Sequence, residues 1–89
     1  DLIVLDLPTP WNAIKAVEKG LRTGGYLVCY NPQITQIAGF VNAVDKNDNF
    51  IYEKTIELIE RNWKIQGQIA RPKSEGIGHT GFLVFVRRV

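Results

Sequence analysis

Several residue types are rare or absent, and each absence removes a class of protein. The only cysteine is Cys29, inside an apolar run, so the chain can form neither an intramolecular disulfide nor a cysteine zinc site. We expect this cysteine to be a small core residue. No apolar run approaches the roughly 20 residues of a membrane span, and no signal peptide is recognisable. We therefore expect a soluble, cytoplasmic protein with no membrane partner.

Methionine is absent altogether, and the 89 residues open directly into an apolar run. We therefore expect Asp1 to be a cut end and the chain to be part of a larger protein. A chain of this length suffices for one small domain, so residues 1–89 are interpreted as a single partial domain. The net charge of +2 permits a nucleic-acid partner without arguing for one. No cluster of metal-ligating residues is visible, and we expect no metal site.

The segment from Asp1 to Trp11 organises the rest of the chain. Leu2 to Leu5 is an unbroken apolar run, which is typical of a strand buried on both faces of a parallel sheet. Asp6 follows it, before two prolines and Trp11 end the strand. Open α/β sheets bind ligands at the carboxyl ends of their strands. Asp6 is therefore a candidate site residue, although an aspartate that caps the next turn has the same pattern.

The next residues predict a strand–helix–strand unit. Thr9 can act as the N-cap of a helix that runs to Arg22, with Pro10 as its first residue, and Gly24–Gly25 ends it. A short apolar strand follows over 26–30. The crossover should be right-handed and the two strands parallel. Tyr30 would then lie at the same sheet edge as Asp6, either as a site residue or as a half-buried strand-end tyrosine with its hydroxyl in water.

A second helix is predicted over 33–45, with Asn31 as a possible cap. Residues 50–65 are ambiguous, because their apolar positions fit a helix and also share the faces of a strand. An alternating α/β chain needs a third strand at this point, so we choose a strand over 52–60.

Residues 65–79 contain glycines, Pro72 and basic residues, and are predicted to be a long loop. The apolar run 81–86 is then a last strand, antiparallel to the others if it forms a hairpin. In that topology the loop would overhang Asp6 and Tyr30. Arg71, Lys73 and His79 are the candidate side chains of this loop. A lone histidine is more often structural than catalytic, and His79 at a strand entrance could simply be hydrogen-bonded there.

Four blocks together resemble a known family. They are residues 5–11 (LDLPTPW), residues 25–32 (GYLVCYNP) followed by Thr35–Gln36, the pair Arg71–Pro72, and residues 78–83 (GHTGFL). Their order and spacing resemble the tRNA (adenine-58 N1) methyltransferases over nearly the whole chain. The resemblance implies the C-terminal half of a Rossmann-like, S-adenosylmethionine-dependent catalytic domain, an α/β fold whose sheet ends in an antiparallel strand.

The resemblance also implies a cofactor and partners. S-adenosylmethionine would be bound mainly by a glycine-rich loop and an acidic residue of the N-terminal half, neither of which is in this chain. The substrate would be a T-loop adenine of tRNA, and the oligomer a homotetramer. The chain would carry the side of the site that receives the base.

Residue roles follow from the same resemblance. Asp6 would lie at the adenine and stabilise the positive charge that develops when N1 is methylated. Pro8 would fix the loop and Trp11 would pack beneath it. Further residues would line the pocket for a flipped base or meet tRNA phosphates, namely Tyr30, His79 and Thr80 for the base, and Arg71 and Lys73 for phosphates.

Two other functions stay open. A non-catalytic tRNA-binding or assembly subunit would keep the fold and lose the chemistry. The presence of Asp6 favours the enzyme over this alternative. A methyltransferase of the same fold that acts on a small molecule or a protein is the third possibility, and the basic block around Arg71 argues against it.

Overall fold

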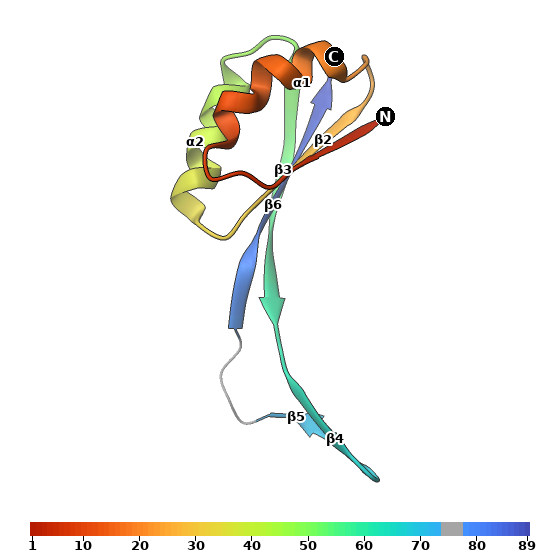
Figure 1. Ribbon diagram of the computed structural model, residues 1–89. Coiled ribbons are helices and arrows are strands. Elements are labelled where there is room, and N and C mark those ends of the chain that lie inside the picture. Colours follow the sequence, from red (N-terminus) through yellow and green to blue (C-terminus); the bar gives the residue numbers. More distant parts are fainter. Residues whose placement is uncertain (74–77) are drawn as a thin grey trace.

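The protein is a mixed sheet with two helices on one face and a long two-stranded arm (Figure 1). The structure, a computed structural model, describes residues 1–73 and 78–89, and the side chains of all of these except Gly78 and His79. The main sheet has the order β1-β2-β6-β3. Its strands are β1 (Leu2–Leu5), β2 (Tyr26–Asn31), β6 (Gly78–Arg88) and β3 (Phe50–Glu60).

The strand–helix–strand unit forms as predicted. β1 pairs in parallel with β2, from Leu2 opposite Tyr26 to Leu5 opposite Cys29. The connecting helix begins as a 3-10 turn, η1 (Pro10–Ala13), and continues as α1 (Ile14–Gly20), so it ends two residues before Arg22. The hydroxyl of Thr9 makes no capping hydrogen bond to the backbone, contrary to expectation. Gly24 has a φ of 88°, the left-handed turn that glycine adopts freely.

The second half of the chain confirms the strand chosen over 52–60 and lengthens both of its final strands. The helix α2 (Ile34–Asp45) leads into β3, which starts at Phe50. The last strand, β6, covers 78–88 rather than 81–86, and it runs antiparallel to both β2 and β3. Residues 50–60 therefore form a strand that pairs with β6, although their local pattern also fits a helix.

The expected long loop is in part wrong, because residues 63–72 form a hairpin. Its strands are β4 (Trp63–Gln66) and β5 (Ile69–Pro72), and Gly67 makes the turn with a φ of 57°. Every residue of both strands is exposed. Each strand has only four residues and no buried face, so the short alternation from Trp63 to Gln66 does not stand out beside the neighbouring glycine and proline.

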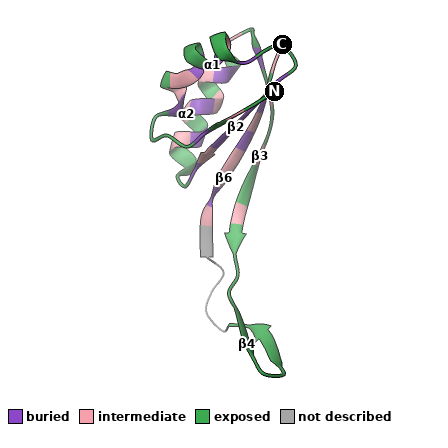
Figure 2. Ribbon diagram, turned by 45° about the vertical axis from the view of Figure 1, so that its right-hand side comes forward, coloured by how far each residue is buried: buried purple, intermediate pink, exposed green. Residues whose placement is uncertain are grey.

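The core lies between the sheet and the two helices (Figure 2). Alternate residues of β2 face it, and Leu27 and Cys29 are fully buried. Phe40 of α2 and Val84 and Val86 of β6 are buried with them. The apolar helical stripes predicted from the sequence supply the other wall of this core.

The opposite face of the sheet carries no helix among the described residues. Leu2 and Val4 are 61% and 62% exposed there, so the expectation that β1 is buried on both faces is not met. A shallow apolar depression of about 440 Å³ lies on this bare face, lined by Asp1, Leu2, Tyr26, Val28 and Phe85. β1 is also an edge strand, since β2 is its one neighbour in the sheet.

Beyond the end of β2, β3 and β6 continue alone as a ribbon. Asn31, the last residue of β2, pairs with Phe82, and the β3–β6 ladder runs on to Glu60 opposite Gly78. We call Leu58–Glu60, Gly78–Gly81 and the β4–β5 hairpin the distal arm. It makes the molecule 53 Å long but only 26 and 18 Å across, and Figure 1 shows the hairpin at its far end.

Two irregularities interrupt the β3–β6 ladder. The register skips Glu53 on β3 and then Thr80 on β6, so the second shift reverses the first. A residue skipped in this way is left out of the ladder, and its backbone groups are available to other partners.

Candidate functional site: the carboxyl edge of β1 and β2

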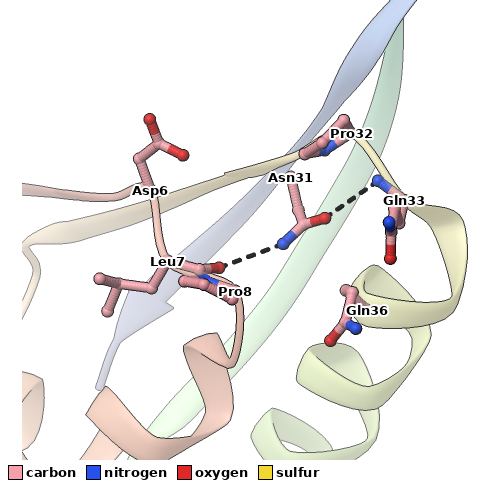
Figure 3. A pocket seen from close by; sticks show the side chains of 7 residues that line it. All are labelled: Asp6, Leu7, Pro8, Asn31, Pro32, Gln33 and Gln36. Atoms are coloured by element: carbon pink, nitrogen blue, oxygen red, sulfur yellow. Dashed lines mark hydrogen bonds between the residues drawn. The ribbon is translucent and has the colours of Figure 1, made fainter.

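A pocket of about 400 Å³ opens where β1 and β2 end. Parallel pairing brings the two carboxyl ends to one edge of the sheet, the position at which open α/β sheets bind ligands. The volume is within the range of about 300–1,000 Å³ that is usual for small-molecule sites. Figure 3 shows its walls, which are Asp6, Leu7, Pro8, Asn31, Pro32, Gln33 and Gln36.

Asp6 supplies the one carboxylate of this pocket wall. It follows the last residue of β1 and is exposed. Continuing the β1–β2 register by one pair places Asp6 beside Tyr30. Burial raises the pKa of the Cys29 thiol to about 11, and the negative charge of Asp6 contributes to this shift. The charge of Asp6 therefore also affects a side chain in the core. Of the predicted site residues, Asp6 and Pro8 are the two that line the pocket.

Asn31 joins the two loops that form the pocket. Its side chain is 4% exposed. The Nδ2 group donates a hydrogen bond to the carbonyl oxygen of Leu7 at 3.1 Å, and Oδ1 accepts one from the backbone N–H of Gln33 at 2.9 Å. The sequence suggested only the second, capping bond. The bond to Leu7 fixes the segment after Asp6 against the start of α2.

Gln36 is a pocket residue that sequence reasoning missed. It lies in the first turn of α2, on the helix side of the pocket (Figure 3). Its Oε1 atom is buried and has no hydrogen-bond partner among the residues that the structure describes. A buried acceptor without a partner costs about 1–3 kcal/mol, so such an atom calls for an explanation. The signal in the sequence was the run Gln33, Thr35, Gln36 directly after a strand end.

Tyr30 and Thr80 are brought together, but not as walls of this pocket. The Tyr30 hydroxyl donates to the carbonyl oxygen of Thr80 at 2.7 Å, and this carbonyl belongs to the residue that the β3–β6 ladder skips. The Tyr30 ring lies on Gly81, where an added Cβ would come within 2.4 Å of it. The Thr80 hydroxyl donates to the carbonyl oxygen of Leu58 at 3.1 Å. This cluster fixes the base of the distal arm to the end of β2.

Trp11 has a packing role. It is half-buried against the core, and a Cβ added to Gly39 of α2 would lie 3.2 Å from its ring. The glycine inside α2 is thus explained by a close approach of this indole. Trp11 braces η1 against α2 and thereby supports the loop that carries Pro8.

Arg71 and Lys73 lie on the distal arm and do not overhang Asp6 and Tyr30. Arg71 is in β5, and the backbone N–H of Lys73 donates to the carbonyl oxygen of Asn62 at 2.8 Å. The direction of the predicted overhang was right, because the arm leaves the sheet at the edge that carries Asp6. The extra length of β3 and β6 carries the hairpin to the opposite end of the molecule from the helices (Figure 1). The predicted role of His79 rests on a side chain outside the described residues.

The hairpin concentrates positive charge. Residues 61–73 contain four of the eleven basic residues of the chain and none of the nine acidic ones. Lys64 stands directly opposite Arg71 in the β4–β5 register. Like charges in that relation are unfavourable unless an anion is present. The arrangement suits a polyanion.

The described residues, 1–73 and 78–89, contain neither a cluster of metal ligands nor a glycine-rich turn at the pocket edge. No group of three metal-ligating side chains occurs among residues 1–73 and 78–89. The helices at the pocket edge are each preceded by proline, at Pro8 and Pro32, and not by a glycine-rich turn. These residues do not fit the cradle that a nucleotide-like cofactor requires. In the part of the chain that the structure describes, no helix has the length and apolarity needed to cross a membrane.

The fold matches part of the S-adenosylmethionine-dependent methyltransferases. A SAM-dependent O-methyltransferase from Thermotoga maritima superimposes with a TM-score of 0.83 and 27% identity, over 100% of this chain and 33% of that one. The tRNA (m1A58) methyltransferase TrmI from Aquifex aeolicus superimposes with a TM-score of 0.78, over 99% and 35% of the two chains, at 24% identity. The α/β class and the antiparallel final strand are as the sequence predicts.

The family follows from the sequence comparisons. The sequence-family model described as the tRNA methyltransferase complex GCD14 subunit matches residues 1–70. The tRNA (adenine(57)-N(1)/adenine(58)-N(1))-methyltransferase TrmI of Methanocaldococcus jannaschii is 40% identical over 98% of the chain, and a TrmI of Thermus thermophilus is 36% identical over 99%. The chain therefore belongs to the TrmI/GCD14 family of tRNA m1A58 methyltransferases. It spans about a third of the length of these relatives, 31% and 34%.

Proposed function

We propose that the protein carrying this chain transfers a methyl group from S-adenosylmethionine to N1 of a T-loop adenine in tRNA, and that this chain forms the target-base side of the site. The observation that supports this most directly is the position of Asp6. It lines a base-sized pocket at the carboxyl ends of two parallel strands, in a chain related to tRNA m1A58 methyltransferases.

Asp6 acts by electrostatics in this proposal. N1 of neutral adenine carries a lone pair, so no base has to remove a proton before the methyl group is transferred. The ring becomes cationic as the bond to N1 forms. A fixed carboxylate at the exocyclic amino group stabilises that charge as it develops. The bond from Asn31 to Leu7 contributes by holding the segment next to Asp6 in place.

Cofactor binding falls mainly outside these residues. S-adenosylmethionine supplies the methyl group when it is bound. The pocket described above has the chemistry of an acceptor site, with one carboxylate and several amides, and the cradle for the cofactor belongs to the other part of the protein.

The hairpin is the proposed tRNA contact. It contains Lys64 and Arg71 and is flanked by Arg61 and Lys73, and no acidic residue occurs between 61 and 73. Basic side chains on phosphates position a nucleic acid without reading its sequence.

A homo-oligomer, a tetramer by family resemblance, is also part of this proposal. Large apolar side chains are exposed along the distal arm, among them Ile59 at 58%, Trp63 at 52% and Ile65 at 77%. Exposed apolar side chains in this number are typical of an interaction surface. Their density on the arm supports contacts between copies there.

The rival function is a non-catalytic tRNA-binding or assembly subunit. A subunit without chemistry has no need for a carboxylate in the acceptor pocket. The retention of Asp6 at that place therefore favours the enzyme.

Replacing Asp6 tests the proposal. In the complete protein, Asp6→Ala is expected to reduce single-turnover methylation about 100-fold, the usual effect of losing one preorganised electrostatic partner. Binding of tRNA should change little. Asp48→Ala, in the exposed turn after α2, is the matched control and should leave both unchanged. Near-normal methylation by Asp6→Ala would refute the assignment.

A further inference from the structure

We propose that Gln36 is a specificity-determining residue that binds the N6–H and N7 edge of the target adenine. This inference rests on the proposed function. Asp6 then takes the amino hydrogen on the N1 side, and the Gln36 amide takes the other amino hydrogen and donates to N7. The base is held along its edge by two side chains from two different elements.

The position of Gln36 supports this role. It shares the pocket with Asp6, and its Oε1 is buried and unpartnered. Its neighbour Ile37 is 2% exposed and packs in the core. This packing fixes the rotation of α2 about its axis and keeps Gln36 on the side of the helix that faces the pocket. Asn31 fixes the start of the same helix through the backbone of Gln33. The residue as a whole is half-buried, so a turn of its side-chain amide, with the helix in place, brings this unused acceptor to the pocket for a ligand that donates a hydrogen bond.

Adenine has the complementary groups. A carboxamide presents one donor and one acceptor side by side, and it pairs in two places with the amino group and N7 of adenine. Guanine and hypoxanthine present two acceptors along the same edge, O6 and N7. A single amide can satisfy only one of these. The contact therefore selects adenine among purines while leaving N1 free to react.

The probe is a tRNA in which the target adenine is replaced by 7-deazaadenine, which lacks the N7 acceptor and keeps N1 and the amino group. For the wild-type complete protein we expect kcat/KM to fall about tenfold with this substrate, the effect of losing one such bond. For Gln36→Ala, kcat/KM with ordinary tRNA should fall by a similar factor. For this variant, the ratio of kcat/KM with ordinary tRNA to kcat/KM with the 7-deazaadenine tRNA should then be close to one.

Gln36→Glu provides a second variant of nearly the same shape. It keeps an acceptor for the amino group but has no donor for N7, so it too should lose its sensitivity to 7-deazaadenine. Asn42→Ala, which removes an exposed amide of α2 outside the pocket wall, is the control and should keep the wild-type ratio of kcat/KM between the two substrates.

The outcomes separate the two hypotheses. A wild-type protein that does not methylate ordinary tRNA refutes the proposed function itself. A wild-type protein that methylates both substrates equally refutes the inference alone. So does a tenfold ratio that persists in both Gln36 variants, because a purely structural glutamine would lower both rates together.

Discussion

Asn31 shows how much one buried side chain can organise. Its two hydrogen bonds connect the segment after β1 with the first turn of α2, and so they define the pocket between them. The sequence predicts its capping bond, because asparagine before a helix commonly caps. The bond to Leu7 could not be predicted, since it joins residues 24 apart that meet only after the sheet has formed.

Cys29 gives a residue-scale prediction about pH. Its thiol ionises with a pKa of about 11 in the folded protein, against 9.0 ordinarily, because burial disfavours the thiolate. The folded state thus favours the neutral thiol, so this contribution to stability is complete below pH 9 and is lost as the pH rises towards 11. Between about pH 8.5 and about pH 10.5 the free energy of unfolding should fall by about 2 kcal/mol through this group.

Cys29→Ala is the control for this measurement. It removes the thiol, so denaturant unfolding at the two pH values should show a smaller loss than in the wild-type protein. The cavity left by the substitution lowers stability equally at both pH values and does not affect the comparison. Parallel curves for the two proteins would show that the thiol ionises normally.

Among the elements, those with a buried face are predictable and those without one are not. The apolar stripe of α2 predicts its limits to within a residue, since its buried positions recur at helical spacing. β3 was ambiguous, because its apolar positions fit a helix as well as the faces of a strand, and its partly buried residues Tyr52, Thr55 and Leu58 recur every three positions. The hairpin β4–β5 was interpreted as a loop because its two strands of four residues have no buried face and are accompanied by glycine and proline.

The hairpin carries the prediction about RNA. If Arg71 and Lys73 contact phosphates, changing both to Gln in the complete protein should weaken tRNA binding. The slope of log K against log salt should fall in magnitude by about 1 for each lost contact. A filter-binding titration over a range of salt concentrations measures this.

Lys15→Gln with Lys19→Gln is the matched control, because both lysines are exposed on α1, away from the hairpin. This pair should change the slope much less. If the hairpin variant keeps the wild-type slope, the arm does not bind phosphates, and its exposed apolar side chains point to contacts between protein chains instead.

For the molecule as a whole, the bare sheet face and the free edge of β1 are the dominant features. No charge or proline interrupts Leu2–Leu5, and an unblunted edge strand readily pairs with another chain. We predict that the isolated 89-residue chain self-associates or aggregates and binds S-adenosylmethionine weakly or not at all. Sedimentation together with a cofactor titration measures both.

The substitution Val4→Lys tests whether self-association is caused by the β1 edge and the bare sheet face or by the distal arm. It places a charge on the bare face of the edge strand and should shift the isolated chain towards monomer more than Ile65→Lys on the hairpin does. A monodisperse wild-type monomer that binds cofactor tightly would overturn the interpretation as a partial domain.

The paired irregularities of β3 and β6 have a consequence for how this family can vary in length. Because the skip at Glu53 is cancelled by the skip at Thr80, the strands are in step again beyond Leu58. A residue gained or lost in the hairpin turn leaves everything before it in place. A residue added or lost among the paired positions between Lys54 and Leu58 would instead shift the following stretch against β6 and turn its side chains to the opposite face. Insertions should therefore accumulate at the tip of the arm and be purged from its base.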